Sequence, residues 1–161
     1  MLKNRIVLLS ELFRMAMGIM FIYSCIHKIT HPHAFLITVE NYEVLPDWMA
    51  TGVAALLPWF ELIIGICLLL GIYVKGSCIL TIGMFLSFAY GIGFNLIRGR
   101  TIDCGCFTPG SGTELISWWS FIREFLLIGI IGFVMIQDTY PLGILHLFIK
   151  KQNIQKSKIA I

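Results

Sequence analysis

The stretch Cys78–Ile97 reads CILTIGMFLSFAYGIGFNLI and contains no charged residue. As an α-helix, these 20 residues would extend about 30 Å, which is the thickness of the hydrocarbon core of a bilayer. A buried strand is much shorter, and helices of soluble domains usually carry a polar face. The sequence therefore predicts a transmembrane helix at this position.

Three other apolar runs of similar length surround this stretch. They cover residues 6–29, 49–73 and 118–136, and each is close to the ~20 residues that cross a bilayer. The predicted fold is an all-α integral membrane protein, a four-helix transmembrane bundle. The first run contains Glu11 and Arg14 and is followed by no small-residue cleavage site, so we expect a retained helix and not a signal peptide.

The C-terminal segment differs from the four runs. Residues 141–149 are apolar but too few to cross a bilayer, so we expect a short interfacial segment there. Residues 150–161 contain four lysines and are expected to form a basic cytoplasmic tail near anionic lipid headgroups. We therefore predict a single membrane domain over residues 1–149, followed by the tail.

The composition excludes several classes of protein. Hydrophobic residues make up 58% of the chain and charged residues only 13%, whereas soluble domains average about 45–50% and about 25%. So few charges cannot cover the surface of a soluble enzyme, and so apolar a chain does not stay disordered. The net charge of +3 is too small to indicate nucleic-acid binding, so the expected partners are protein and membrane lipid.

The distribution of Lys and Arg predicts the orientation in the membrane. Seven basic residues lie on the side of the chain termini: Lys3, Arg5, Lys75, Lys150, Lys151, Lys156 and Lys158. Three lie on the other side: Lys28, Arg98 and Arg100. Because cytoplasmic loops carry the excess of basic residues, both termini should be cytoplasmic. Residues 31–47 and 98–117 then face the periplasmic (extracytoplasmic) side of the inner membrane.

The loop at residues 98–117 contains Cys104 and Cys106, separated by one glycine. Thiols on an extracytoplasmic face can oxidise. A disulfide across so short a spacing is strained, and strained disulfides are easily reduced. A structural staple would close a longer loop, because a small loop removes little chain entropy. The pair is therefore predicted to be a redox-active dithiol.

Charged residues near the pair complete the predicted catalytic set, which is Cys104, Cys106, Asp103, Arg100 and Arg123. Arg100, together with Arg98, is expected to favour the reactive thiolate. Asp103 is expected to oppose that effect or to accept a proton. Arg123 lies shallowly beneath the loop in the fourth apolar run, where it is a candidate for a proton route or a polar site for a quinone headgroup. A structural ion-pair network that fixes the bundle is the alternative.

Other interpretations of the cysteines remain open. His31 and His33 share the membrane face with Cys104 and Cys106, and two Cys with two His suit a soft metal ion. The C-x-C spacing is tighter than that of usual zinc sites, so no metal is assigned. Alternatively, the two thiols only shape the loop. Cys25, about one turn from the outer end of the first helix, is a candidate resolving thiol.

Charges inside the apolar runs should be paired or functional, because an isolated charge costs at least ~2.5–3.5 kcal/mol at the helix centre. Arg14 and Glu61 lie at similar depths in antiparallel helices, which predicts an ion pair between them. Arg123 and Glu124 are adjacent in the chain, and neighbours at i and i+1 point in different directions. The sequence therefore predicts that Arg123 and Glu124 do not pair with each other.

The segment Ile102–Phe107, IDCGCF, resembles the D-C-G-C-F segment of MauE-type methylamine-utilisation membrane proteins. These belong with the wider DoxX-like group of small four-helix membrane proteins. Other segments resemble the same group: Arg14–Lys28, His27–His33, Asn41–Pro46, Pro58–Gly65 and Arg123. The resemblance implies a role in maturing the disulfide-rich small subunit of methylamine dehydrogenase, or a related client.

The cysteine pair and the resemblance together predict a membrane thiol–disulfide oxidoreductase, or maturation factor, that promotes disulfide formation. The expected partner is a thioredoxin-like or disulfide-containing extracytoplasmic protein. The expected electron acceptor is a membrane quinone, by analogy with other small four-helix disulfide-generating membrane enzymes. The alternatives are a non-enzymatic assembly factor of the DoxX type and a reductive thiol electron carrier.

Overall fold

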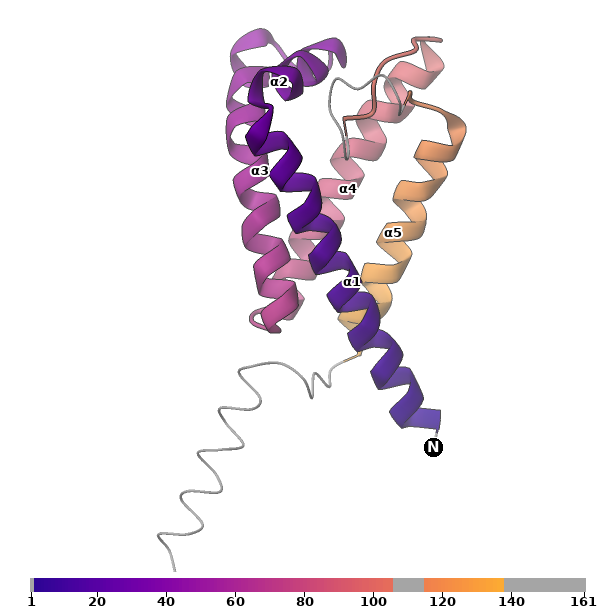
Figure 1. Cartoon of the computed structure of the whole chain (residues 1–161). Helices are drawn as coiled ribbons and strands as arrows, with labels where there is room; N and C mark the ends of the chain where they lie inside the picture. The colour runs from indigo at the N-terminus through magenta and orange to yellow at the C-terminus, as the bar shows by residue number, and fades with distance from the viewer. Residues whose placement is uncertain (1, 106–114, 138–161) are drawn as a thin grey trace, which may run out of the picture.

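The computed structural model describes residues 2–105 and 115–137, and its regular elements there are helices (Figure 1). They are α1 (Leu2–Thr30), α2 (Pro32–Asn41), α3 (Asp47–Leu70), α4 (Val74–Ile97) and α5 (Trp118–Ile136). Within the described residues, α1, α3, α4 and α5 are long and apolar enough to cross a membrane. The prediction of an all-α, four-helix membrane bundle is therefore confirmed.

The four long helices alternate in direction along the chain (Figure 1). α1 packs against α3, α4 packs against α5, and contacts between α1 and α5 join the two pairs. α2 lies at the end of the bundle where α3 begins, and residues 98–105 lie at the same end. We call this the loop end. The opposite end carries the N-terminus and the turn at residues 71–73.

α2 corrects the expectation that residues 31–47 form a loop. The chain turns at residue 31, between the end of α1 and the start of α2, and Pro32 is the first residue of the α2 helix. Proline fits the first helical turn because its fixed φ is helical and its missing N–H has no partner there in any case. Phe35 and Thr38, about one turn apart, are both buried. α2 therefore packs one face onto the loop end.

α1 and α3 approach each other closely at two glycines. A Cβ atom added to Gly18 would lie 3.0 Å from the carbonyl oxygen of Gly65, and one added to Gly65 would lie 3.1 Å from that of Gly18. Helices in membranes associate through small residues because close packing, and not exclusion of water, holds them together. The Gly18–Gly65 crossing therefore positions α1 against α3.

Substitution of Gly65 by leucine should destabilise the bundle by about 1–3 kcal/mol, the usual cost of overpacking a well-packed contact. Gly83→Leu is the matched control, because a Cβ atom at Gly83 in α4 meets no atom within 4 Å. Thermal unfolding of both variants in detergent would measure the difference. Equal melting temperatures for the two variants would contradict the close crossing.

Arg14 belongs to a buried network near the opposite end of the bundle. Its Nη2 atom lies 2.5 Å from Glu11 Oε2, and both side chains are only 1% exposed. It also donates to the carbonyl oxygens of Leu68 and Leu69, in the last turn of α3. Carbonyls in a last turn have no partner within their helix and carry the negative end of its dipole. Arg14 therefore stabilises the C-terminus of α3.

The predicted Arg14–Glu61 ion pair is wrong. Glu61 pairs with Lys28, whose Nζ atom lies 2.5 Å from Glu61 Oε1. Lys28 is 1% exposed, so it belongs to the interior of the bundle and not to a flanking loop. The predicted depths assume that neighbouring helices end at one level. However, α3 begins at Asp47, about 21 Å from Glu61 along the helix, whereas α1 ends two residues after Lys28.

The remaining C-terminal predictions lie outside the described residues. They concern the interfacial segment at residues 141–149 and the basic tail at residues 150–161. The domain boundary at residue 149 stays a prediction for the same reason.

Candidate functional site

Cys104 lies at the loop end, in the segment that follows α4. Its side chain is 1% exposed and packs in a small core with Ile92 and Ile116. It is disulfide-bonded. The free thiols within the described residues are Cys25, Cys67 and Cys78. Cys106, the second member of the predicted pair, lies outside the described residues.

A short antiparallel contact holds the backbone next to Cys104. The N–H of Ile116 donates to the carbonyl oxygen of Ile102 at 2.9 Å. Asp103 forms an isolated antiparallel bridge with Leu115. These contacts hold residues 102–103, just before Cys104, against residues 115–116, just before α5.

Gly105 is required both by its conformation and by its surroundings. Its φ is +65°, in the left-handed region, which other residues adopt at a cost of roughly 1–2 kcal/mol. A Cβ atom at this position would lie 2.5 Å from Cγ2 of Thr38 in α2. The Gly105 N–H donates to Asp103 Oδ1 at 3.2 Å. A glycine therefore allows residues 102–105, which we call the cysteine segment, to lie directly against α2.

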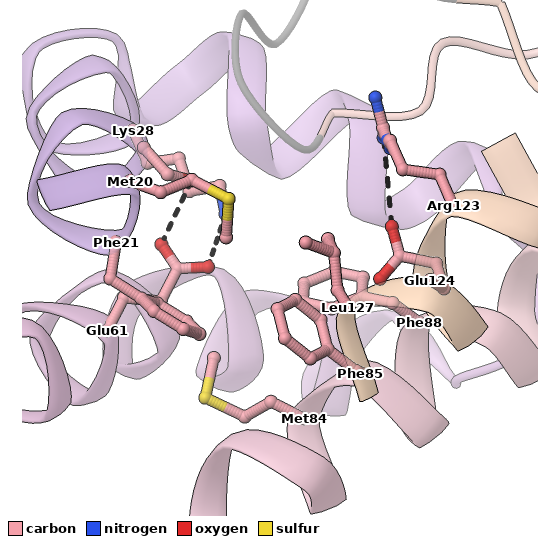
Figure 2. A pocket seen from close by; sticks show the side chains of 11 residues that line it. Met20, Phe21, Lys28, Glu61, Met84, Phe85, Phe88, Arg123, Glu124 and Leu127 are labelled. Carbon is pink, nitrogen blue, oxygen red and sulfur yellow. Dashed lines mark hydrogen bonds and ion pairs between the residues drawn. The ribbon is translucent and has the colours of Figure 1, made fainter. Parts of the chain in front are cut away.

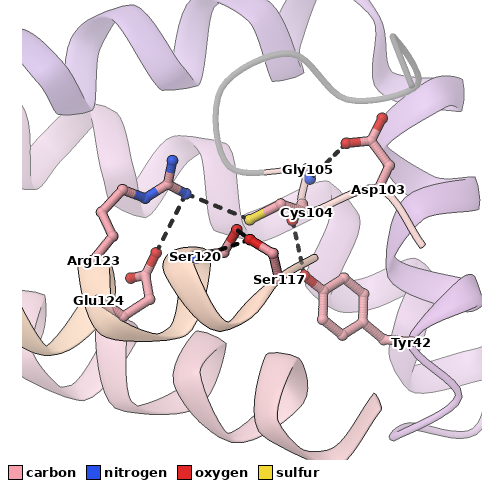
Figure 3. Close-up of polar contacts among 8 residues, drawn as sticks. All are labelled: Tyr42, Asp103, Cys104, Gly105, Ser117, Ser120, Arg123 and Glu124. Carbon is pink, nitrogen blue, oxygen red and sulfur yellow. Dashed lines mark hydrogen bonds and ion pairs between the residues drawn. The ribbon is translucent and has the colours of Figure 1, made fainter. Parts of the chain in front are cut away.

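Tyr42, just after α2, connects this helix to the cysteine segment. Its hydroxyl donates to the carbonyl oxygen of Cys104 at 2.9 Å (Figure 3). Burial raises the pKa of the Tyr42 phenol, so the hydroxyl stays protonated and remains a donor. Asn95 Nδ2 in α4 donates to the Tyr42 carbonyl oxygen at 2.9 Å. Gly91 leaves room for the tyrosine ring, since a Cβ atom there would lie 2.9 Å from Cδ1.

Arg123 and Glu124, in the second turn of α5, lie beside Cys104 (Figure 3). Arg123 Nη2 is 3.6 Å from Cys104 Sγ and 3.7 Å from Glu124 Oε1. The prediction that Arg123 and Glu124 do not pair is therefore wrong, because the long arginine side chain reaches the carboxylate although the two Cβ atoms diverge. Ser117 Oγ accepts from the N–H of Ser120 at 3.3 Å and caps the helix that carries both residues.

Arg98 and Arg100 both pair with Glu43, which follows Tyr42 in the chain. Arg100 Nη1 lies 2.7 Å from Glu43 Oε1, and Arg98 Nη1 lies 4.0 Å from Oε2. The hydrogen bond from Arg100 lowers the pKa of Glu43. Of the arginines considered from the sequence, Arg123 is the one for which the described structure records a contact with Cys104 Sγ.

A cavity of about 30 Å³ lies inside the bundle, between α1, α3, α4 and α5 (Figure 2). Lys28 and Glu61 line one side of it, and Arg123 and Glu124 line the other. Ser24 contributes a hydroxyl that donates to Glu61 Oε2 at 3.5 Å. The apolar lining consists of Met20, Phe21, Met84, Phe85, Phe88 and Leu127. The cavity has room for about two waters, since one water needs roughly 10–15 Å³.

The other candidate residues lie elsewhere. Cys25 is fully buried in α1, and its Sγ donates to the carbonyl oxygen of Ile22 at 3.1 Å. His31 and His33 are exposed. Among residues 2–105 and 115–137, no three His, Cys, Asp or Glu residues are grouped so that they could hold a metal ion.

Sequence reasoning missed Thr38, Asn95 and the carboxylate of Glu124 as parts of this site. Asn95 is fully buried and is the only amide side chain in the stretch Cys78–Ile97. A polar group within an apolar span is a signal of a specific contact, and that signal was available. Thr38 gave no such signal, because its role depends on how closely α2 packs against Gly105.

The family model for the methylamine utilisation protein MauE matches residues 6–137. The chain belongs to the MauE family. Residues 6–137 include all four membrane-spanning helices from Ile6 onward, together with α2 and the segment that contains Cys104.

Curated relatives agree with the MauE assignment. Four of them bear the name methylamine utilization protein MauE. The protein from Methylorubrum extorquens is 36% identical over 59% of this chain and 51% of its own length. That from Methylophilus methylotrophus is 35% identical over 66% and 56%, and that from Paracoccus denitrificans is 31% identical over 71% and 61%. The chain thus matches from about half to three fifths of the length of these relatives. No solved structure matches the chain significantly.

Proposed function

We propose that the chain is a membrane thiol–disulfide oxidoreductase, or maturation factor, that uses Cys104 and Cys106 to promote disulfide formation in a partner protein. Membership of the MauE family supports a role in methylamine utilisation. The disulfide-rich subunit of methylamine dehydrogenase, or a related protein, is the proposed client. The contact between Arg123 Nη2 and the buried Cys104 Sγ carries the proposal.

The Arg123 contact gives the two sulfurs of the proposed pair different roles. A guanidinium beside a sulfur favours its thiolate form, and a stabilised thiolate is the better leaving group in disulfide exchange. Cys104 is only 1% exposed, so a thiolate of another protein cannot reach it. The client therefore attacks Cys106, and Cys104 leaves as the thiolate beside Arg123.

The exchange balances in bonds and electrons. A client thiolate forms a bond to Cys106 Sγ while the Cys104–Cys106 bond breaks, and the electron pair goes to Cys104 Sγ. A second client thiolate then attacks the client sulfur of the mixed disulfide and releases Cys106. The client leaves with a new disulfide, and the cysteine pair holds two electrons.

The acceptor of these electrons is proposed to be a membrane quinone. The cavity between Lys28–Glu61 and Arg123–Glu124 does not fit its ring, because about 30 Å³ is far below the roughly 150 Å³ of a cavity that binds benzene. A quinone would therefore have to approach the cysteines from the lipid at the loop end. In this proposal the electrons therefore pass from the cysteines to the quinone outside the cavity.

In this proposal the loop end faces the extracytoplasmic side of the inner membrane. Lys28 no longer counts among the three basic residues that oppose this orientation, since it is buried. Trp48, Trp118 and Trp119 begin their helices at the loop end and are exposed, as expected for residues at a membrane interface. A thioredoxin-like or disulfide-containing protein on that side is the proposed partner.

Trapping of a mixed disulfide tests the proposal. In the Cys104→Ser variant, the Cys106 thiolate should attack the disulfide of an oxidised client and form a mixed disulfide, which Cys104 is no longer present to resolve. That adduct should accumulate and disappear on reduction. In the Cys106→Ser variant, the remaining Cys104 is buried, so we expect several-fold less adduct. Non-reducing electrophoresis with mass spectrometry would identify the partner and the cysteine that it is bound to.

The outcomes separate the alternatives. Adducts in neither variant would favour the non-enzymatic assembly factor, in which the two cysteines only shape the loop. More adduct on Cys104 than on Cys106 would reverse the assigned roles of the two sulfurs. Adducts that depend on Cys67 or Cys78, the free thiols toward the opposite end of the bundle, would favour the reductive carrier.

A further inference from the structure

The charges around the cavity are balanced in the described structure, where Lys28, Glu61 and Glu124 are buried and Arg123 is partly buried. With Lys28 and Arg123 as cations and Glu61 and Glu124 ionised, the four charged side chains that line the cavity sum to zero. Lys28 lies 2.5 Å from Glu61, and Arg123 lies 3.7 Å from Glu124. A balanced set of pairs is the form in which charges can be buried at tolerable cost.

Reduction of the disulfide adds a negative charge to this balanced set. The new charge appears on Cys104 Sγ, next to the guanidinium that also contacts Glu124. Both contacts are made by the same atom, Arg123 Nη2. Two anions that share one cation in a buried site cannot both stay ionised without a large cost, and the usual outcome is that one of them binds a proton.

We infer that Glu124 takes up a proton when the Cys104 disulfide is reduced and releases it when the disulfide forms again. This inference rests on the proposed function of the cysteine pair. With Glu124 neutral, the Arg123 cation is balanced by the Cys104 thiolate, and the charges around the site still sum to zero.

The other groups that face Glu124 are already committed to partners. On α1 and α3, Lys28 and Glu61 pair with each other, and Ser24 also donates to Glu61. Beside the cysteine segment, Tyr42 donates to the Cys104 carbonyl oxygen, and Asp103 accepts from Gly105. α4 contributes to the cavity lining through Met84, Phe85 and Phe88, none of which is charged. Glu124 is therefore the carboxylate whose cation the new thiolate shares.

The cavity gives the proton a place to move. It is lined by Glu124 and Arg123 and has room for about two waters. Cys104 Sγ and Glu124 Oε1 are no further apart than the sum of their distances to Arg123 Nη2, a gap that one or two waters can bridge. The proton that Glu124 binds is one of the two that the client dithiol releases.

The full reduction step balances with this assignment. The disulfide takes two electrons from the client dithiol, which loses two protons as its own disulfide forms. One proton binds Cys106, the other binds Glu124, and Cys104 remains a thiolate. Transfer of both electrons to a quinone returns both protons, and the quinone is converted to the quinol.

Infrared difference spectroscopy of the full-length protein in lipid, with a small dithiol as reductant, tests the inference. Reduction should produce the carbonyl stretch of a protonated carboxyl group, and reoxidation should remove it. Glu124→Gln should lose this band. Glu61→Gln is the matched control and should keep it, because that carboxylate pairs with Lys28 on the other side of the cavity. Glu124→Asp should keep a band at a shifted frequency.

Mass-tag alkylation of the same samples reports separately whether the disulfide is reduced. A disulfide that is reduced with no carboxyl band in the wild-type protein would overturn the inference and leave the proposed function intact. A band that survives in Glu124→Gln and vanishes in Glu61→Gln would assign the proton to Glu61 and would equally overturn it. A Cys104 that the dithiol never reduces would overturn the proposed function itself, and the inference with it. If Glu124→Gln does not fold, the shift expected in Glu124→Asp decides the same question.

Discussion

Replacement of Lys28 by methionine should destabilise the protein by about 3–5 kcal/mol, the loss typical of a buried ion pair that loses one partner. Lys28 Nζ is the cation nearest to Glu61 Oε1, at 2.5 Å, and both side chains are nearly inaccessible to solvent. The ammonium also lies over the rings of Phe35 and Phe88, at 5.1 and 5.4 Å from their centroids. Methionine keeps much of the side-chain volume but leaves the Glu61 carboxylate buried without its counter-charge. Thermal unfolding in detergent would measure the loss.

The double variant Lys28→Met with Glu61→Leu should recover most of this stability, because apolar residues of similar volume often replace a buried ion pair at little cost. Lys75→Met is the matched control, since it removes a lysine that is exposed at the start of α4. Its effect should stay within about 0.5 kcal/mol. The buried ion pair is disproved if Lys28→Met has the same melting temperature as the wild-type protein. It is also disproved if the double variant is no more stable than the single one.

The number and position of the spanning helices could be predicted because they depend on local composition. An uncharged run such as Cys78–Ile97 has few alternatives to crossing a bilayer, and its length alone is nearly decisive. The position of the cysteine segment at the loop end follows from the same reasoning. Lengths and compositions of single segments are properties that a sequence contains directly.

The partners of the buried charges could not be predicted in the same way. The pairing of Lys28 with Glu61 depends on where α1 ends relative to α3, and α2 lies between them in the chain. Linear depth along each helix contains no information on that offset. The Arg123–Glu124 contact likewise depends on how a long, flexible side chain bends, which a rule about the directions of Cβ atoms does not describe.

The residues that hold Cys104 in place illustrate a second limit. Tyr42, Thr38 and Asn95 come from segments far apart in the sequence and meet only because α2 packs on the loop end. The local sequence does not distinguish a proline that begins a helix from a proline in a turn. The formation of α2 therefore depends on its packing against the rest of the bundle. Contacts between separate elements, such as those that position Cys104, therefore cannot be predicted from the sequence of each element.

Replacement of Gly105 by alanine should displace Cys104 from Arg123 and destabilise the loop end. The left-handed φ of +65° costs alanine roughly 1–2 kcal/mol. The new methyl group would also lie 2.5 Å from Thr38 Cγ2, and overpacking of this kind costs about 1–3 kcal/mol more. We expect a lower melting temperature and, after reduction, faster alkylation of Cys104, because the sulfur is no longer packed between α2, α4 and α5.

Two matched variants separate the two causes. Gly99→Ala meets the same backbone demand, since Gly99 has a φ of +68°, but a Cβ atom there contacts nothing within 4 Å. It should therefore show only the smaller, conformational part of the loss and leave the alkylation of Cys104 unchanged. Thr38→Ser added to Gly105→Ala removes the clashing Cγ2 while keeping the hydroxyl that donates to the Ala34 carbonyl oxygen at 2.9 Å. That pair should fall back to the level of Gly99→Ala. If Gly105→Ala behaves like Gly99→Ala from the outset, α2 does not hold the cysteine segment, and the burial of Cys104 must have another cause.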